Sequence, residues 1–583
     1  MAFNNNKLGE LRPNQIITTF GPGAIVDAVK DSVTVLDTNY WADKGKKIID
    51  GRLASYLGVD CFYMPRTSYA GDIPVVTFPY MHVCSNLKCG RLFDARDNFQ
   101  LDRYLKFGVT CPNCQHNAYP ARFITICENG HMDDFPWRWW VHKGNTTCNG
   151  EMRMYSTGNT STLADMYVEC SCGAKRSMSG ATQKENFEGL SCSGHHAFRP
   201  NVKNKKCDKA IIPSQRGASN VYFAVNRSAI SIPPWINPLY NLIDEHLHDI
   251  ELAKKLMGED GVSKIYEMYF AAYTRQEFDE ALARRLNNIT EFKEIKQMEY
   301  DAITHHSDPA YASNKKHFKA EEDELPSYLK EYFSRIIRIT RLREVRVLLG
   351  FTRVDAPDPD ADADEQTNVV LLNKSKTERW LPAAEVHGEG IFIEFNKQTL
   401  EKWINNNVKD ISLKYEECYK EFCNTKGWKV NILRNATYVL MHTFSHLMIK
   451  EMSMSSGYSS SAIRERIYFG EKMAGVLLYT GSADKEGSLG GLVELGYVTK
   501  LVSLMRDAFQ EALLCTNDPE CMNNMPAGNN SNGAACHSCC MISETACENG
   551  NRMLDRGLVV PIVGRENEAY FKELVSELCQ LEV

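Results

Sequence analysis

The sequence lacks the features of a membrane or secreted protein. No uninterrupted apolar run approaches the roughly 20 residues that a membrane-spanning helix requires. The N-terminus, MAFNNNKLGE, is polar and does not have the apolar core of a signal peptide. A basic excess is also missing, because 67 Lys and Arg stand against 74 Asp and Glu. We therefore expect a cytoplasmic protein without membrane contact, whose binding to nucleic acid depends on a local patch or a partner.

Two common catalytic motifs are absent as well. The sequence has no GxxxxGK[ST] loop, and the glycines of FGPG are not followed by a Lys that could reach a phosphate. His442 and His446 are four residues apart, as in HExxH metalloproteases, but Thr443 stands where the Glu is needed. We therefore expect neither P-loop ATP hydrolysis nor peptide hydrolysis. The two histidines are interpreted as core residues that hydrogen-bond to neighbouring loops.

Cysteine, in contrast, is abundant. Most of the 20 cysteines fall in closely spaced groups, and in a reducing compartment such groups favour metal ligands over disulfides. Thiolates at these spacings suit the tetrahedral coordination of Zn²⁺. The sequence therefore predicts Zn²⁺ as the cofactor, held in three sites of four cysteines each.

The first and third predicted sites rest on CxxC pairs. In the first, two pairs separated by about twenty residues have the spacing of a zinc ribbon, with a redox-active CxxC as the alternative. Its ligands are Cys84, Cys89, Cys111 and Cys114. The third site surrounds a polar loop that a metal ion would order. Its ligands are Cys515, Cys521, Cys536 and Cys539, with Cys540 and Cys547 as possible substitutes.

The second predicted site is looser, because it combines a CxC pair with two later single cysteines. Its ligands are Cys170, Cys172, Cys192 and Cys207. Several neighbouring side chains offer substitutes for one of the four, namely Cys127, Cys148, His195 and His196.

Two clusters allow an enzymatic alternative, a metal-dependent nuclease. The segment CENGHMDDFPW brings Cys127 and His131 close to the carboxylates of Asp133 and Asp134, which could handle protons beside a catalytic metal. The segment ETACENGNRMLDR is expected to be helical, which would place Glu544, Asn551 and Asp555 on one face. The alternative interpretation is structural: His131 and Asp133 pin a tryptophan-rich core. We expect no catalytic residue and no enzymatic activity.

The predicted fold is multidomain, α+β and α/β. N-terminal zinc-ribbon-like modules are followed by a helical insert and by a C-terminal α/β domain with a Cys-rich zinc site. Near the end of the insert, Arg335, Arg338 and Arg341 are expected on a solvated helix face. An acidic loop, VDAPDPDADADEQ, interrupts the second half. The expected parts are a β-rich segment, a zinc ribbon module, a second Cys-rich module, the helical insert and the C-terminal domain, at residues 1–80, 81–147, 148–235, 236–345 and 346–583.

Several segments together carry a family resemblance over nearly the whole chain. They are LRPNQIITTFGPGAIVD, CENGHMDDFPW, RGASNVYF, RLREVRVLLGFTRVD, WLPAAEVHGEGIFIEF, HTFSHLM, GSLGGLVELG and AACHSCCMISETACENGNRMLDR. The sequence resembles the DrmB family, components of the DISARM anti-phage defence system. Its C-terminal part is similar to the zinc-binding domain of MrfA-type DNA-repair helicases, whose first two cysteines are closer together than Cys515 and Cys521.

The resemblance implies bacterial antiviral defence against phage DNA. The partners that it implies are a DrmA-type SNF2 helicase, phage DNA and other DISARM subunits, including a DNA methyltransferase. It matches Cys515, Cys521, Cys536 and Cys539 to zinc-binding thiols and brings no established catalytic residue. We therefore expect a zinc-binding, non-catalytic partner that helps the helicase engage DNA and stimulates its ATPase, with a nuclease acting on unmodified phage DNA as the alternative.

Overall fold

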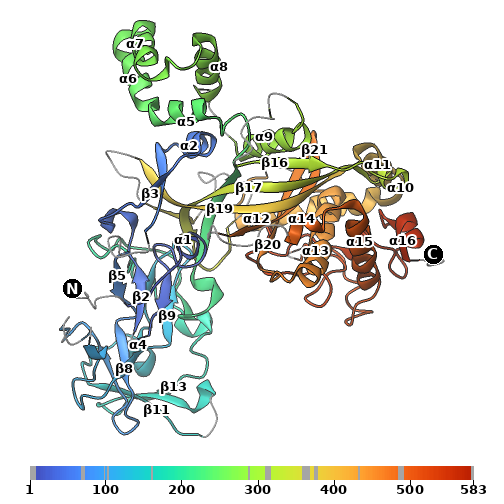
Figure 1. Cartoon of the computed structure of the whole chain (residues 1–583). Coiled ribbons are helices and arrows are strands. Elements are labelled where there is room, and N and C mark those ends of the chain that lie inside the picture. Colours follow the sequence, from blue (N-terminus) through green and yellow to red (C-terminus); the bar gives the residue numbers. More distant parts are fainter. Residues whose placement is uncertain are drawn as a thin grey trace.

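The structure is a computed structural model in which three lobes meet at a central sheet (Figure 1). The N-terminal lobe contains small sheets, a helical lobe stands apart at the top of the view, and the C-terminal lobe packs helices on the sheet. The structure describes residues 8–579 apart from 30, 67–72, 98, 101–103, 105, 159–161, 287–288, 290, 309–310, 312–316, 358–367, 373–378, 431–432, 483–490 and 529. Most of the acidic loop at 354–366 therefore lies outside the described residues.

Two long strands form the axis of the molecule. Strand β17 (Phe333–Thr352) pairs antiparallel with β19 (Trp380–Phe395) over most of their length. The sheet order is β15-β17-β19-β21-β20, with antiparallel pairing along this path. The other strands of the sheet are β15 (Phe223–Ile230), β20 (Ile463–Gly470), β21 (Met473–Ser482), β3 (Lys46–Ile48), β4 (Cys61–Met64), β16 (Lys319–Glu322) and β18 (Val370–Leu371).

Strand β17 corrects one sequence-based expectation. The three-residue spacing of Arg335, Arg338 and Arg341 was expected on a helix face, but these residues lie within β17. The segment between them is rich in β-branched residues, which pack well on a pleated sheet. Arg338 consequently reaches across to Asp323, next to β16, with a nitrogen–oxygen distance of 3.0 Å. The prediction of a helix here was wrong because it relied on the spacing of the arginines and gave too little weight to the β-branched residues between them.

The helices of the C-terminal lobe cover one face of this sheet (Figure 1). Helix α13 (Ala436–Ser456) is buried on nearly all sides, as expected for a helix that is apolar all round. It contacts α15, β20 and β21. The other helices of the lobe are α10 (Ser327–Lys330), α11 (Lys397–Trp403), α12 (Lys409–Lys426), α14 (Gly491–Glu494), α15 (Val498–Leu513) and α16 (Lys572–Cys579). The expected mixture of helices and sheets is confirmed, and its main sheet is antiparallel.

The segment expected as a helical insert, 236–345, contains helices up to Thr304 and strands β16 and β17 after that. Four of its helices form the lobe at the top of Figure 1, and the fifth, α9, returns to the central sheet. These helices are α5 (Pro238–Glu245), α6 (Leu247–Met257), α7 (Glu259–Ile265), α8 (Arg275–Leu286) and α9 (Phe292–Thr304). None of the described helices is both long enough and apolar enough to span a membrane.

In the described residues, the N-terminal part of the chain forms short strands in three small sheets, together with short helices. The sheet orders are β1-β2-β5, β10-β9-β14 and β13-β12-β11-β7-β6-β8. The strands are β1 (Ile25–Asp27), β2 (Ser32–Val35), β5 (Val75–Thr77), β6 (Met81–Cys84), β7 (Arg91–Asp94), β8 (Ala118–Pro120), β9 (Phe123–Ile126), β10 (Met132–Asp134), β11 (Met152–Ser156), β12 (Met166–Cys170), β13 (Lys175–Ser177) and β14 (Ile212–Gln215). The helices are α1 (Pro13–Thr18), α2 (Gly51–Leu57) and α4 (Trp137–His142).

The segment ETACENGNRMLDR is not a helix, which corrects a second expectation. Gly550, Asn551 and Met553 adopt φ values of 58°, 57° and 60°, and this left-handed conformation interrupts a right-handed helix. Asp555 is buried and binds Tyr415 and Arg565, with distances of 2.7 and 2.8 Å from its Oδ2. The helix face of Glu544, Asn551 and Asp555, on which the nuclease alternative partly relied, is therefore not formed.

One buried ion pair joins the helical insert to the sheet, and its removal tests this connection. Glu299 on α9 binds Arg466 on β20 through two hydrogen bonds of 2.6 and 3.0 Å, and both side chains are buried. Glu299→Gln removes the nearer of two carboxylates that pair with the buried guanidinium, the other being Glu548 at 3.9 Å. We therefore expect a loss of about 3–5 kcal/mol in the free energy of unfolding. Urea unfolding of the full chain measures this loss. The control Glu169→Gln breaks the exposed pair with Arg153 and should leave the unfolding midpoint unchanged; equal effects would contradict the account.

Candidate metal centres

Five groups of side chains in the described residues bring four potential metal ligands together. In each group, one ligand atom per residue lies within 4.8 Å of all the others. We name them the ribbon site (Cys84, Cys89, Cys111, Cys114), the hairpin site (Cys127, His131, Cys192, Cys207), the tryptophan-helix site (His142, Cys148, Cys170, Cys172), the C-terminal site (Cys515, Cys521, Cys536, Cys539) and the mixed site (His442, His446, Glu465, Cys547).

The spacing within the four cysteine-rich groups fits Zn²⁺. Zinc bonds of about 2.0–2.3 Å in a tetrahedron place neighbouring ligand atoms roughly 3.3–3.8 Å apart. The sulfur–sulfur distances are 3.3 and 3.8 Å in the ribbon site, 3.6 Å in the tryptophan-helix site and 3.5 to 3.7 Å in the C-terminal site. A disulfide bond is about 2.05 Å long. The donors and their separations are therefore those of zinc sites.

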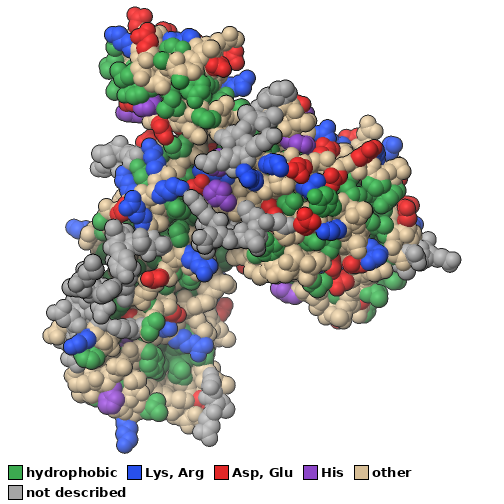
Figure 2. Space-filling view, viewed as in Figure 1, with side chains coloured by type: hydrophobic (Ala, Val, Ile, Leu, Met, Phe, Trp, Pro, Cys, Tyr) green, Lys and Arg blue, Asp and Glu red, His purple; other side chains and the backbone are tan. Residues whose placement is uncertain are grey.

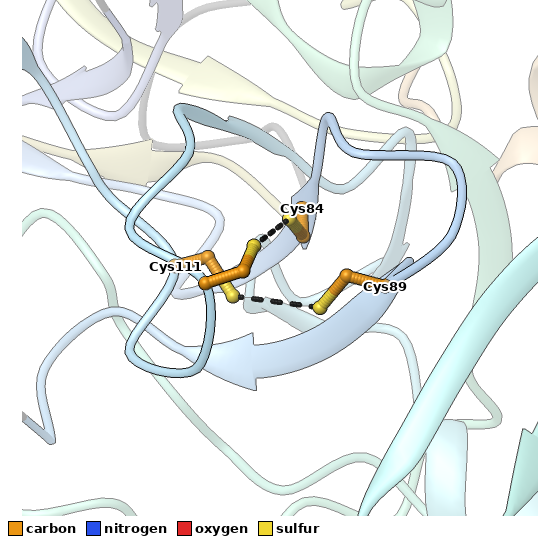
Figure 3. Close-up of side chains that lie close together, drawn as sticks. Cys84, Cys89 and Cys111 are labelled. Atoms are coloured by element: carbon orange, nitrogen blue, oxygen red, sulfur yellow. Dashed lines mark hydrogen bonds between the residues drawn. The ribbon is translucent and has the colours of Figure 1, made fainter.

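The ribbon site unites four residues as a zinc ribbon does. Cys84 ends strand β6, Cys89 lies in the turn before β7, and Cys111 and Cys114 flank the turn before β8. Figure 3 shows Cys84, Cys89 and Cys111 with their sulfur atoms turned toward one another. The backbone amide of His116 lowers the pKa of Cys114 to about 6, so this thiol ionises readily. The four thiols singled out from the sequence thus lie together, with the geometry that a metal ion needs.

The cysteines of the second predicted site divide between two groups. Cys170 and Cys172, at the end of β12, meet His142 and Cys148 in the tryptophan-helix site. Cys192 and Cys207 meet Cys127 and His131 in the hairpin site. The grouping therefore differs from a single four-cysteine site, because one further cysteine and one histidine complete each group. Cys148 and Cys127, which the sequence suggested as substitutes, each belong to one of the two groups.

Helix α4 explains how the tryptophan-helix site obtains its histidine. Trp137 and Trp140 bury one face of this helix, and His142 at its end is thereby held near the β12 turn. The Nδ1 of His142 lies 2.8 Å from the carbonyl oxygen of Arg138, and its Nε2 lies 3.3 Å from the sulfur of Cys172. A ligand histidine commonly donates its second N–H to a backbone carbonyl in this way.

The hairpin site is built on the turn between β9 and β10. Cys127 follows β9 and His131 precedes β10, and the sulfur of Cys127 lies 3.3 Å from Nδ1 of His131. A hydrogen bond from the thiol of Cys192, together with His131, lowers the pKa of Cys127 to about 4 even though burial opposes this. Cys127 is therefore poised to ionise and bind a cation. The sequence signal for this site was the CENGH segment itself.

The carboxylates beside the hairpin site have other partners. Asp133 accepts a 2.6 Å hydrogen bond from the hydroxyl of Ser193, and Asp134 accepts one of 3.1 Å from the backbone amide of Met81. Burial raises the pKa of Asp134 to about 7. Neither carboxylate belongs to a metal-type group in the described residues. His195 and His196, the other suggested substitutes, also lie outside these groups.

The C-terminal site brings together the four predicted cysteines after helix α15. Cys540 and Cys547, the suggested substitutes, are not among its four residues. A hydrogen bond from the thiol of Cys540 lowers the pKa of Cys539 to about 5. The buried guanidinium of Arg556 donates two hydrogen bonds, of 2.6 and 2.8 Å, to Asp518 and so braces the loop between Cys515 and Cys521.

A recurring hydrogen bond marks the thiols of these groups. In each, the backbone amide two residues after a cysteine donates to its sulfur. The distances are 3.4 Å at Cys148, Cys192 and Cys515, and Asn86 donates to Cys84 in the same way. Such amides stabilise a thiolate because they place positive partial charge beside it.

The mixed site draws on three distant parts of the chain. His442 and His446 lie on helix α13, Glu465 on β20 and Cys547 in the segment that was expected to be helical. The two histidines are buried in the core, as the sequence indicated, and His446 bonds to the carbonyl oxygen of Cys540. Their convergence on Glu465 and Cys547 could not be foreseen from the local sequence.

Together, the fold and these groups define a multidomain protein with several cysteine-rich, zinc-type centres arranged around one antiparallel sheet. Residues 444–540 match the model of the MrfA Zn-binding domain, which contains the whole C-terminal site. Residues 12–223 match a domain of unknown function, DUF8724, which contains the ribbon, hairpin and tryptophan-helix sites.

A full-length relative identifies the family. The chain is 45% identical over 567 residues to the DISARM protein DrmB of Bacillus paralicheniformis, and this alignment covers 94% of the chain and 100% of the relative. The chain therefore belongs to the DrmB family of DISARM proteins.

The division of the second predicted site into two can be tested by metal counting. Cys170→Ser and Cys192→Ser should each lower the zinc content of the purified chain by one equivalent. The double variant should lose two equivalents, because the two thiols belong to separate groups. Elemental analysis measures the content, and Cys579→Ser, outside all five groups, is the control. A loss of only one equivalent in the double variant would indicate a single shared site.

Proposed function

We propose that this DrmB-family chain is a zinc-stabilised, non-catalytic DISARM subunit that engages phage DNA together with a DrmA-type SNF2 helicase and raises the ATPase activity of that helicase. Membership of the DrmB family supports the assignment to DISARM. The proposal that the chain offers rigid contact surfaces rests on the zinc-type groups. Four ligands on one ion fix loops that have little apolar area to bury. The proposed role of Zn²⁺ is therefore to hold contact surfaces rigid while the helicase supplies the motion.

One such surface lies beside the tryptophan-helix site. On the sheet β11–β12–β13, alternate residues form an outward face, on which Glu169 pairs with Arg153 at 2.8 Å, while the opposite side packs in the core. The aromatic and basic residues of this face are Arg153, Tyr155, Tyr167 and Lys175. The rings of Tyr155 and Tyr167 are stacked with centroids 6.1 Å apart, and the Lys175 ammonium lies 4.5 Å from the Tyr167 ring. Aromatic rings interleaved with cations are typical of surfaces that bind nucleic-acid strands. We call these four residues the tyrosine face.

The charge distribution implies that any contact with DNA is made by a local patch of the surface. On the view in Figure 2, basic and acidic side chains are interspersed over the C-terminal lobe, in keeping with the formal net charge of -7. The average field of the chain therefore does not attract phosphates. Contact with DNA must come from a defined patch, and the tyrosine face combines positive charge with flat rings.

Two observations favour the non-catalytic proposal over the nuclease alternative. Asp133 and Asp134 bind Ser193 and Met81, and the segment with Glu544 and Asp555 is not a helix. The nuclease alternative would be supported if the wild-type chain cleaved DNA in Mg²⁺ or Mn²⁺ and Asp133→Ala did not.

DNA binding through the tyrosine face gives one prediction. Replacing both Tyr155 and Lys175 by Ala should weaken DNA binding by about tenfold or more, because one stacked ring and one phosphate contact are lost. The slope of log affinity against log salt should fall by about one. Fluorescence anisotropy at several salt concentrations measures both quantities. Lys500→Ala, an exposed lysine on α15, is the control and should change neither; equal weakening by the control would count against this face.

The role as a helicase partner gives a separate prediction. Adding the purified chain to a DrmA-type helicase should increase the DNA-stimulated ATPase rate, while the chain alone should hydrolyse no ATP. A coupled ATPase assay measures the rate with and without DNA. A helicase rate and DNA affinity that do not respond to the chain would contradict the proposed role.

A further inference from the structure

A buried group of mixed ligands lies in the C-terminal lobe, apart from the four cysteine-rich sites. His442, His446 and Glu465 are fully buried, each with 0 to 2% of its surface exposed. The Nε2 atoms of the two histidines lie 3.0 and 3.3 Å from the same oxygen, Oε1 of Glu465. The Nε2 of His442 is also 3.2 Å from the sulfur of Cys547. Four potential ligand atoms thus surround one point.

Protons alone satisfy these contacts only if a buried imidazole becomes charged. The Nδ1 of His446 lies 2.9 Å from the carbonyl oxygen of Cys540, and because a carbonyl only accepts, this nitrogen carries the N–H. In the neutral imidazole the lone pair of Nε2 then faces the Glu465 oxygen, which is also an acceptor. Two acceptors at this distance repel each other unless a cation, either the proton of a charged imidazolium or a metal ion, lies between them. On His442, one Nε2 proton could serve Glu465 or Cys547 but not both well.

A metal ion at the centre satisfies all four contacts at once. The three distances, 3.0 to 3.3 Å, are close to the ligand separations of roughly 3.3–3.8 Å around a tetrahedral zinc ion. The histidine geometry repeats that of His142, whose Nδ1 faces a backbone carbonyl while its Nε2 faces a thiol. Bonding of the second ring nitrogen to a carbonyl orients a metal-binding imidazole.

The surroundings of the group also fit ion binding. The backbone amides of Asn549 and Asn551 lie 3.2 and 3.3 Å from the sulfur of Cys547, and the first repeats the two-residue pattern of the cysteine-rich sites. The amide of Glu548 donates to Oε1 of Glu465 at 3.1 Å, and the Ser445 hydroxyl donates to its other oxygen. These hydrogen bonds hold the thiolate and the carboxylate in place, as partners of metal ligands do.

A cavity adjoins the group. Glu465 and Cys547 line this cavity of about 150 Å³, whose other walls include Lys296, Arg464 and Arg466.

We propose that His442, His446, Glu465 and Cys547 bind a divalent transition-metal ion, with Zn²⁺ as the expected occupant. A thiolate and two imidazoles do not suit the hard ions Mg²⁺ and Ca²⁺, and this donor set prefers zinc over manganese and iron(II). Four protein ligands leave no open position, which is the pattern of a structural rather than a catalytic site. The ion would join helix α13, strand β20 and the segment after Cys540. Two of its four ligands, His442 and Cys547, lie outside the matched zinc-binding domain at 444–540.

Metal counting on matched variants of the full chain tests this proposal. Cys547→Ser should lower the metal content by one equivalent and leave the cysteine-rich sites loaded, as measured by elemental analysis and native mass spectrometry. Cys418→Ser replaces a buried cysteine outside all five groups and should lose none. An unchanged metal content in Cys547→Ser would overturn the proposal.

A second variant and the unmodified chain cover the case in which Cys547→Ser does not fold. Glu465→Gln preserves the side-chain volume and the acceptor for the Glu548 amide, and it too should lose one equivalent. Native mass spectrometry of the unmodified chain should show five bound ions. Four ions or fewer on the unmodified chain would overturn the proposal without any variant.

Discussion

The fold of the N-terminal half depends on one constraint: in each of its three cysteine-rich groups, thiols and an imidazole or thiols alone must meet at one point. Its strands are three to five residues long around these groups, and small sheets of this kind bury little apolar surface. The cysteines lie at strand ends and in the turns between strands, where a bound metal ion would close loops that the core does not. The same logic applies after α15, where a polar Asn- and Gly-containing loop is closed at its base by Cys515, Cys521, Cys536 and Cys539.

The central sheet connects these centres mechanically. Strands β17 and β19 run from the N-terminal lobe to the C-terminal lobe (Figure 1), β4 extends one end of β19, and the buried Glu299–Arg466 pair attaches the helical insert. Hydrogen-bonded strands therefore join the two lobes. This arrangement suits the proposed role beside a translocating helicase.

The sequence predicted those metal-type groups whose ligands lie close together along the chain. The ribbon and C-terminal cysteines were found because each set lies within a short stretch, where turn geometry alone brings thiols together. The hairpin and tryptophan-helix sites were merged because His131 and His142 enter from a turn and a helix end. The mixed site was missed because Glu465 and Cys547 meet α13 only after the sheet and the final segment have packed. Left-handed residues such as Asn551 broke a helix that side-chain spacing alone suggested.

The account is tested most directly by locating the metal ions in the folded chain. An anomalous difference map collected at the zinc absorption edge from crystals of the full chain would do this without any substitution. We predict one peak at the centre of each of the five groups, including the point between His442, His446, Glu465 and Cys547. The absence of a peak from the cysteine-rich groups would contradict the claim that metal ligation organises this fold.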